Sequence, residues 1–190
     1  QPATVPATGK QESIIRIEQA GMYHITARSD FGTACEVVDH FRGPFAQSGR
    51  VGKTNCELDL LLDSGRYKLR LESPKKAKGQ VQVAATPFRE IASPITRLDA
   101  GRFDHRVLKS GEQSSWWIAQ GKRGQVTLTV IGRTAGVLRL WKDGKWVEDL
   151  QANRRELSPR EGQPIYHWTL SGMLEQGNYL LTAYGADARR

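Results

Sequence analysis

The sequence lacks the features that mark several large classes of protein. No window is apolar over the length of a membrane-spanning helix, and none combines the charged and apolar regions of a signal peptide. No stretch has the apolar spacing of a long amphipathic helix either. These absences argue against a helical membrane protein and against a helical bundle. The sequence starts with Gln1 rather than Met, which indicates a processed or excised segment.

Residues that carry common catalytic chemistry are few and scattered. The four histidines, His24, His40, His105 and His167, have no Cys, His or carboxylate neighbour at a metal-ligand spacing. No Gly-x-Ser-x-Gly motif is present, and no pair of carboxylates stands out by its context. We therefore expect a protein that is not an enzyme, with no catalytic residues, metal ligands or cofactor. A His beside a carboxylate in a deep pocket would instead favour an enzyme site.

Residues 49–54 end in Gly-Lys-Thr, as phosphate-binding loops do. A Walker A motif would need Gly where Gln47 stands, and it would need a helix after Thr54. Here Asn55 and Cys56 lead into a β-rich run instead. We interpret the segment as a Gly-rich basic loop that binds no nucleotide.

The two cysteines, Cys35 and Cys56, both lie in the first half of the chain, and nothing around them has a metal-ligand spacing. We predict that they form an intramolecular disulfide, which by loop closure would stabilise the fold by about 3 kcal/mol. A disulfide implies an oxidising compartment, so we expect a periplasmic or extracellular protein. The alternative is two buried free thiols in a cytosolic protein.

The chain is basic, with a formal net charge of +8 and a pI of about 9.7. Such a charge raises the question of an anionic partner. The basic residues are dispersed, and Gly or acidic residues interrupt three small groups of them: Lys75, Lys76 and Lys78; Lys122 and Arg123; Arg154, Arg155 and Arg160. Solvated loops and strand edges explain this distribution, so we expect no nucleic-acid partner.

What the sequence does contain is a pattern that occurs twice. Its five residues in the first half recur with identical spacing in the second: Leu58, Leu62, Gly65, Tyr67 and Leu69 become Leu170, Leu174, Gly177, Tyr179 and Leu181. A second block recurs at a slightly smaller offset: Ile15, Gly21, Ile25 and Ala27 become Ile118, Gly124, Leu128 and Val130. One longer loop in the second copy accounts for the difference. The repetition predicts two copies of one supersecondary unit, each with its own core.

Short β-rich runs bounded by Gly, Ser, Asp and Pro fill both halves of the chain. In the first half they cover residues 14–18, 22–27, 34–39, 56–62, 66–71 and 80–85. In the second half they cover residues 115–119, 125–131, 137–142, 145–149, 164–170 and 178–184. Many short strands with regular turns are typical of antiparallel β-sandwiches. We predict an all-β protein of two tandem β-sandwich domains, jelly-roll or immunoglobulin-like, related by internal duplication.

Residues 87–104 contain Pro87, Pro94 and Gly101 with few apolar residues, which is typical of a linker. We place the domain boundary in this segment. The first sandwich would cover residues 11–94 and contain the disulfide. The second would cover residues 95–187 and be rich in tryptophan.

The repeated Gly-x-Tyr-x-Leu has a simple structural interpretation. A Gly before a strand allows a turn, and residues two apart on a strand share a face. Tyr67 and Tyr179 are therefore expected in their cores, where each hydroxyl would find a nearby acceptor. Trp116, Trp117 and Trp168 have polar neighbours on their strands, and we expect them to fill the second core.

Residues 141–146, with the sequence WKDGKW, predict a β-hairpin, because Asp-Gly favours a two-residue type I′ turn. In that register Trp141 lies opposite Trp146, and further out Arg139 lies opposite Glu148. Alternation along the strands places these four side chains on one face of the sheet.

The other face of the same strand carries Leu138 and Leu140. If these leucines are in the core, the indoles are at least partly exposed and could bind a neighbouring domain, another protein or a sugar ring. The simpler interpretation is that the rings cover the sheet or pack under a long loop at residues 150–163. The candidate contact residues are therefore Trp141, Trp146, Arg139 and Glu148.

The run Leu-x-Leu-Trp-x-Asp-Gly at residues 138–144, followed by the closure Leu-x-x-x-Leu-x-x-Gly-x-Tyr at residues 170–179, resembles the pre-peptidase C-terminal type of β-sandwich module. The first unit, through residues 35–38 and 58–71, is similar to a diverged copy. Such modules are non-catalytic appendages of secreted and periplasmic proteins. Members that bind calcium use clustered acidic loop residues, which this sequence lacks, so the resemblance implies no metal.

A pair of such sandwiches with paired cysteines is also similar to the N-terminal region of bacterial alpha-2-macroglobulin-like proteins, which are periplasmic protease inhibitors. This second resemblance rests on layout, because the bait region and the macroglobulin domains do not occur in these residues. It implies a non-enzymatic scaffold that contacts other domains of its parent chain or an envelope protein. The alternative is a carbohydrate-binding module of a secreted enzyme, with a polysaccharide as partner.

Overall fold

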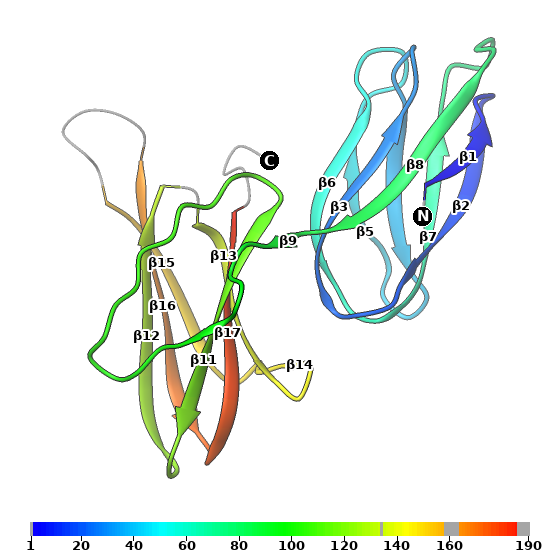
Figure 1. Cartoon of the computed structure of the whole chain (residues 1–190). Coiled ribbons are helices and arrows are strands. Elements are labelled where there is room, and N and C mark those ends of the chain that lie inside the picture. The colour runs from blue at the N-terminus through cyan, green and yellow to red at the C-terminus, as the bar shows by residue number, and fades with distance from the viewer. Residues whose placement is uncertain (1, 134, 158–163, 186–190) are drawn as a thin grey trace. The chain divides into compact units, whose positions relative to one another are not determined.

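The computed structural model describes residues 2–133, 135–157 and 164–185, and every helix or strand element in them is a β-strand (Figure 1). The predicted all-β class is confirmed. The chain divides into two compact units, Gln1–Pro87 and Phe88–Arg190. Within the described residues, no helix has the length and apolar character needed to cross a membrane.

The first unit consists of two four-stranded antiparallel sheets. One sheet has the order β1 (Ala3–Pro6), β8 (Gln80–Pro87), β3 (Gly21–Arg28) and β6 (Cys56–Leu62). The other has the order β2 (Lys10–Ile17), β7 (Gly65–Glu72), β4 (Ala34–Asp39) and β5 (Gly43–Ser48). Figure 1 shows these two sheets as the blue-to-green layers of the unit.

One apolar core joins the two sheets of the first unit. Strand β7 illustrates the cause: Tyr67, Leu69 and Leu71 are buried while the basic residues between them are exposed, so one face points inward. Ile25 of β3 and Val37 of β4 are fully buried in the same core and come from different sheets. Two antiparallel sheets around a shared core fit a β-sandwich.

The second unit contains a six-stranded and a three-stranded sheet. The larger has the order β10 (Thr96–Arg97), β11 (Glu112–Gln120), β17 (Gly177–Gly185), β13 (Ala135–Lys142) and β14 (Lys145–Trp146), and β9 (Arg89–Glu90) also pairs with β11. The smaller has the order β12 (Gly124–Gly132), β16 (Ile165–Leu174) and β15 (Gln151–Leu157). Both sheets contribute to a second core: Trp116, Ile118, Leu138, Leu140, Leu150, Leu170, Leu174, Tyr179, Leu181 and Ala183.

Three strand pairs of the first unit have a counterpart in the second with the same register. In β2–β7 Ile15 faces Tyr67, and in β11–β17 Ile118 faces Tyr179. In β4–β7 Val37 faces Leu69, and in β13–β17 Leu140 faces Leu181. In β3–β6 Ile25 faces Leu58, and in β12–β16 Leu128 faces Leu170. Each counterpart lies at the offset of the sequence repeat. The order β2-β7-β4-β5 is likewise matched by β11-β17-β13-β14.

Both repeated tyrosines are buried, as predicted, and each closes the turn before its strand. The Tyr67 hydroxyl donates to the carbonyl of Asp63 at 3.2 Å and accepts from the N–H of that residue at 3.1 Å. The Tyr179 hydroxyl donates to the carbonyl of Glu175 at 2.9 Å. Each therefore bonds the carbonyl four residues upstream. A similar bond forms the tyrosine corner of immunoglobulin domains.

The segment expected as a linker contributes strands to the second unit. The compact units divide after Pro87, earlier than the expected boundary between residues 94 and 95. Strands β9 and β10 lie in the expected linker, and both pair in parallel with β11. These short pairings explain why the chain joins the second unit so early. The expected end of the second domain, residue 187, lies outside the described residues.

Two further expectations differ from the structure. Residues 150–163 were predicted as a loop, yet β15 occupies Gln151–Leu157, and residues 158–163 lie outside the described part of the chain. Trp117 was expected in the core but is 45% exposed, because it points to the face of β11 opposite Trp116. Strands β1 and β5 were not predicted.

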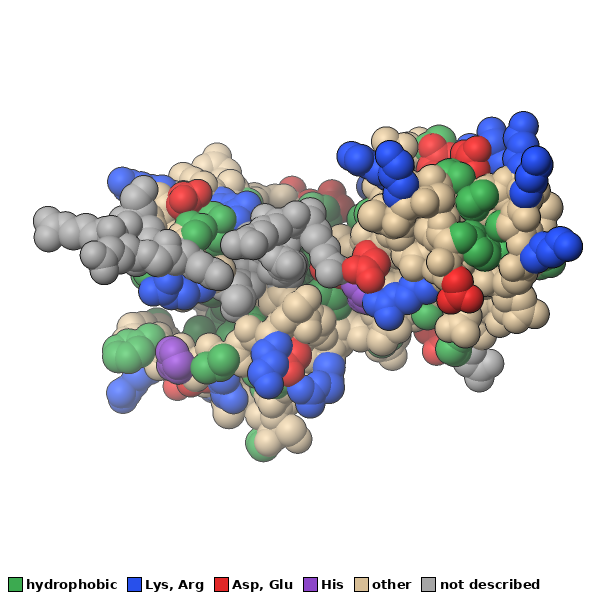
Figure 2. All heavy atoms as spheres, turned by 90° about the horizontal axis from the view of Figure 1, so that it is seen from above, with side chains coloured by type: hydrophobic (Ala, Val, Ile, Leu, Met, Phe, Trp, Pro, Cys, Tyr) green, Lys and Arg blue, Asp and Glu red, His purple; other side chains and the backbone are tan. Residues whose placement is uncertain are grey.

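The basic side chains form several separate groups on the face shown in Figure 2. Several Lys and Arg side chains of the described residues pair with acids, among them Arg28–Glu57, Lys68–Glu12, Arg70–Glu36, Arg97–Asp99 and Arg123–Glu175. Most of these side chains are well exposed, so each pair contributes little to stability.

Candidate contact surface

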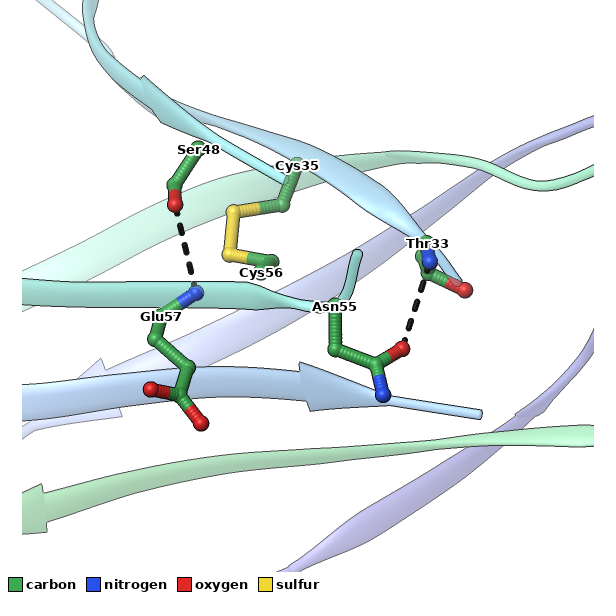
Figure 3. Close-up of a disulfide and its surroundings, with 6 residues drawn as sticks. All are labelled: Thr33, Cys35, Ser48, Asn55, Cys56 and Glu57. Atoms are coloured by element: carbon green, nitrogen blue, oxygen red, sulfur yellow. Dashed lines mark hydrogen bonds between the residues drawn. A yellow bond between two sulfur atoms is a disulfide. The ribbon is translucent and has the colours of Figure 1, made fainter. Parts of the chain in front are cut away.

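The predicted disulfide between Cys35 and Cys56 is present (Figure 3). It joins β4 of one sheet to β6 of the other, across a Cα–Cα distance of 5.6 Å, and both residues are buried. Next to it, the hydroxyl of Ser48 on β5 accepts a hydrogen bond from the N–H of Glu57 on β6 at 3.3 Å. A disulfide at this place is compatible with an exported protein.

The predicted hairpin between β13 and β14 is confirmed in its turn and in the Trp141–Trp146 pair, but β14 ends at Trp146 and not at residue 149. Trp141 lies opposite Trp146, and the next pair inward joins the residues that flank the turn. Asp143 and Gly144 have φ angles of 51° and 74°. Positive φ at both central residues defines a type I′ turn, which Asp-Gly adopts readily because Gly has no Cβ and Asp tolerates this region.

The two hairpin indoles differ in exposure. Leu138 and Leu140 are in the core, so the indoles lie on the outer face of the sheet. Trp146 is 41% exposed, whereas Trp141 is only 7% exposed. The expected exposure therefore holds for Trp146 and is wrong for Trp141. Trp141 lies between β17, where it faces Leu180, and β14, where it faces Trp146. Strand β14 is the last strand of its sheet and leaves Trp146 at the edge.

Arg139 packs on Trp146 rather than pairing with Glu148. Its guanidinium carbon lies 4.6 Å from the centroid of the Trp146 ring, within cation–π range. One terminal nitrogen donates to the carbonyl of Leu138 at 3.0 Å. Strand β14 ends at Trp146, so Glu148 lies in an exposed turn, and the ion pairs of the described residues do not include it.

Three polar side chains on the same outer face, Glu90, Ser115 and Thr182, form a hydrogen-bonded chain. The Glu90 carboxylate accepts from the hydroxyl of Ser115 at 2.6 Å and from its N–H at 3.2 Å. The Ser115 and Thr182 hydroxyls lie 3.0 Å apart. Tyr184 lies two residues further along β17 and is buried beside this chain. Burial raises the pKa of Tyr184 to about 12, so the phenol stays neutral at physiological pH.

Sequence reasoning missed this buried chain because it treated the outer face as solvated. Glu90, which ends the chain, and Phe88, which packs beside it, lie in the segment expected as a linker. The Phe88 ring packs edge-on against Tyr184 with centroids 6.1 Å apart. One signal was available: the outward positions of β17 carry Thr182 and Tyr184 rather than charged residues, unlike those of β7 in the first unit.

His24 lies beside a carboxylate that sequence spacing did not indicate. Its Nδ1 is 2.6 Å from Oδ1 of Asp59, which faces it across β3 and β6. The Asp59 side chain is only 8% exposed, and its Oδ2 has no hydrogen-bond partner. In the described residues no third group hydrogen-bonds to His24, so the pair offers a base and its orienting carboxylate without a nucleophile. The lack of enzymatic activity stays a prediction.

The arrangement around Arg139 and Trp146 is suited to binding. Within the parts of the chain that the structure describes, no group of three or more His, Cys, Asp or Glu is placed to hold a metal ion. No protein-family model matches the sequence, and no curated protein matches it. Its function must therefore follow from the residues.

The exposed indole of Trp146 lies next to the partly buried guanidinium of Arg139. Together they offer a partner a ring for stacking, apolar area and hydrogen-bond donors.

Proposed function

We propose that the chain is a pair of β-sandwich modules that arose by duplication of one unit. The shared strand order and the three shared registers support this origin, because unrelated sheets have no reason to agree at the two offsets of the sequence repeat. The equivalent hydroxyl bonds of Tyr67 and Tyr179 support it further. The resemblance to pre-peptidase C-terminal modules agrees with such a pair.

The modules act as a non-enzymatic scaffold in an exported protein, either periplasmic or extracellular. The disulfide supports export, because cytosolic thiols are kept reduced. The resemblance to bacterial alpha-2-macroglobulin-like protease inhibitors gives the most specific form of the proposal. In that form the two modules belong to the N-terminal region and contact other domains of the parent chain or an envelope protein.

The observation that carries the contact role is the stack of Arg139 on Trp146. Arginine and tryptophan are among the residues that dominate the energy of protein interfaces. Trp146 is 41% exposed on a hairpin whose turn and register are well defined. A rigid support of this kind lowers the entropy lost on binding.

A photo-crosslinking amino acid in place of Trp146 tests this role. In the full-length protein in its host envelope, we expect position 146 to yield one discrete product whose peptides map to another domain or to an envelope protein. Position 117 is the matched control, because Trp117 is similarly exposed at 45% and lies on the same sheet. Trp146→Ala should weaken the identified contact without changing the far-ultraviolet circular dichroism.

Equal and diffuse labelling at positions 146 and 117 would contradict the contact role. Cross-linked glycan in place of peptide would favour the carbohydrate-binding alternative. That alternative also predicts quenching of tryptophan fluorescence by soluble oligosaccharides. The burial of Trp141 leaves only one hairpin ring for stacking on a sugar.

A further inference from the structure

The two units place opposite charges at the same position of equivalent strands. Glu36 on β4 and Arg139 on β13 correspond at the offset that relates Val37 to Leu140. On the neighbouring strand, Arg70 of β7 corresponds to Thr182 of β17. Because both registers agree, each residue can be compared with its counterpart in the same surroundings.

In the first unit the charge at this position is satisfied within the chain. A terminal nitrogen of Arg70 donates to Glu36 Oε2 at 3.1 Å, and Arg70 Nε lies 3.6 Å from Glu12 Oε1. Lys68 adds a further contact to Glu12 at 3.0 Å. Acids and bases thus alternate across three adjacent strands, β2, β7 and β4. This face of the first unit needs no outside partner.

In the second unit the corresponding position carries a basic residue, Arg139, and the neighbouring strands supply no acidic residue to pair with it. Thr182 and Ser115 stand where the first unit has Arg70 and Glu12, and both hydroxyls are used in the chain that leads to Glu90. No carboxylate of the described residues lies within ion-pair distance of Arg139.

The side chain of Arg139 is also partly removed from water. Its Nε is buried without a hydrogen-bond partner, although one terminal nitrogen donates to a carbonyl. Burial lowers the pKa of Arg139, which reflects the unfavourable transfer of its charge from water. An arginine that loses hydration and gains no acid lowers the stability of the free protein.

We propose that Arg139 receives a carboxylate from an acidic segment of the protein that binds this surface, with Trp146 as the apolar platform beside it. This inference rests on the proposed contact role and adds the chemistry of the partner. A planar guanidinium matches a carboxylate through two parallel hydrogen bonds, and Trp146 already fixes its plane. The net charge of +8 favours the approach of an acidic segment.

A hexaglutamate peptide is a suitable probe, and hexaglutamine of equal length is its neutral control. In nuclear magnetic resonance titrations of the whole chain, we expect hexaglutamate to shift the Trp146 indole and the Arg139 side-chain signals selectively. Added salt should weaken the effect, because the charges are partly exposed. Arg139→Gln should reduce the affinity roughly tenfold or more, since a hydrogen-bonded charge is lost.

Arg70→Gln is the matched control variant, because Arg70 is already paired within the chain and should leave hexaglutamate binding unchanged. Arg139→Met keeps much of the stem that packs on Trp146 and removes the charge. We expect it to lose hexaglutamate binding with a denaturation midpoint equal to or above that of the wild type. Arg139→Lys should bind more weakly than wild type, because the ammonium lacks the planar fork.

Equal shifts with hexaglutamine, or equal loss of binding in Arg70→Gln and Arg139→Gln, would overturn the proposal. A lower denaturation midpoint in Arg139→Met would also overturn it, because Arg139 would then be structural. These failures are separate from failure of the contact role. If position 146 still cross-links to a defined protein segment while hexaglutamate does not bind, the surface is a contact site for a partner that is not acidic.

Discussion

The two units connect their sheets differently at one pair of equivalent positions. At the offsets of the sequence repeat, Leu138 corresponds to Cys35 and Trp168 corresponds to Cys56. The first unit joins its sheets there with a covalent bond. In the second unit Leu138 is buried and Trp168 packs against the same core. The same strand arrangement therefore accommodates either a disulfide or a large aromatic ring between its two sheets.

The two solutions act on different states of the chain. A disulfide stabilises mainly by restricting the unfolded ensemble, whereas an aromatic ring stabilises the folded core through buried area and dispersion contacts. The first unit should therefore respond to reductant and the second to truncation of its core. Four changes break or sharpen this comparison.

Trp168→Ala is expected to have the largest effect. Trp168 is a large aromatic, partly buried against the core of the second unit, so its removal lowers the free energy of unfolding by about 3 to 4 kcal/mol, because buried area is lost and a cavity remains. Hydrogen exchange measured by mass spectrometry should show the loss in strands of the second unit only. Trp117→Ala is the control, since its ring is 45% exposed and its removal should change stability little. Equal destabilisation by the two variants would disprove the core role of Trp168.

Removal of the disulfide should have the next largest effect. Replacing Cys35 and Cys56 together with Ala is expected to lower the free energy of unfolding of the first unit by about 3 kcal/mol, because the unfolded chain regains its freedom. Urea denaturation followed by hydrogen exchange can separate the two units. Reductant should have no further effect on this variant. A matching loss in the second unit would contradict the independence of the two cores.

The repeated tyrosines sharpen the comparison because here the units should respond alike. Tyr67→Phe and Tyr179→Phe each remove one hydroxyl bond to the chain four residues upstream, which should lower stability by about 1 kcal/mol in the unit concerned. Tyr166→Phe is the control, since its hydroxyl has no hydrogen-bond partner in the described residues. Thermal denaturation of the three variants checks the prediction, and a loss at only one of the two repeated positions would contradict it.

Asp104 should give the smallest effect, and only in the second unit. The indole N–H of Trp116 donates to Asp104 Oδ2 at 2.8 Å, and this bond, with help from Arg106, holds the pKa of Asp104 below its ordinary value of 3.8. A depressed carboxyl pKa stabilises the fold above the ordinary value, and this contribution is lost as pH falls through the folded pKa. The first unit has Ser13 in place of Trp116 and cannot form such a bond.

Nuclear magnetic resonance titration of Asp104 in the wild type and in Trp116→Phe measures this effect. The pKa of Asp104 should rise toward its ordinary value in the variant, because the largest stabilising bond to the carboxylate is gone. The pKa of Asp39 in the first unit serves as the internal control, since two backbone N–H bonds lower it independently. An unchanged Asp104 pKa would rule out the indole as its cause.

Local sequence rules sufficed for the strands that alternate and for the hairpin. Strand β7 shows apolar residues at every second position, and the Asp-Gly pair fixes the turn after β13. Strand β15 was missed because it is exposed along almost its whole length and has no apolar face to recognise. Strands β9 and β10 have two residues each, and only their pairing with β11 makes them strands.

The candidate surface was predictable in its register and not in its burial. Alternation placed Trp141 and Trp146 on the outer face, and the turn placed them opposite each other. The burial of Trp141 depends on its place between β14 and β17, and β17 lies far away in the sequence. Arg139 turned to Trp146 because β14 ends before Glu148 can face it. Contacts of this kind depend on tertiary packing, which local periodicity does not encode.

The link between Cys35 and Cys56 has a mechanical consequence. If a pulling force acts along the chain, the bond carries the load directly, and the segment between the two cysteines stays out of the force path. With a sequence separation of 21 residues, about 70 Å of contour length is withheld. The second unit has no such shortcut, because the chain's cysteines are both used in the first. When both units unfold under tension, the second unit therefore extends further than the first.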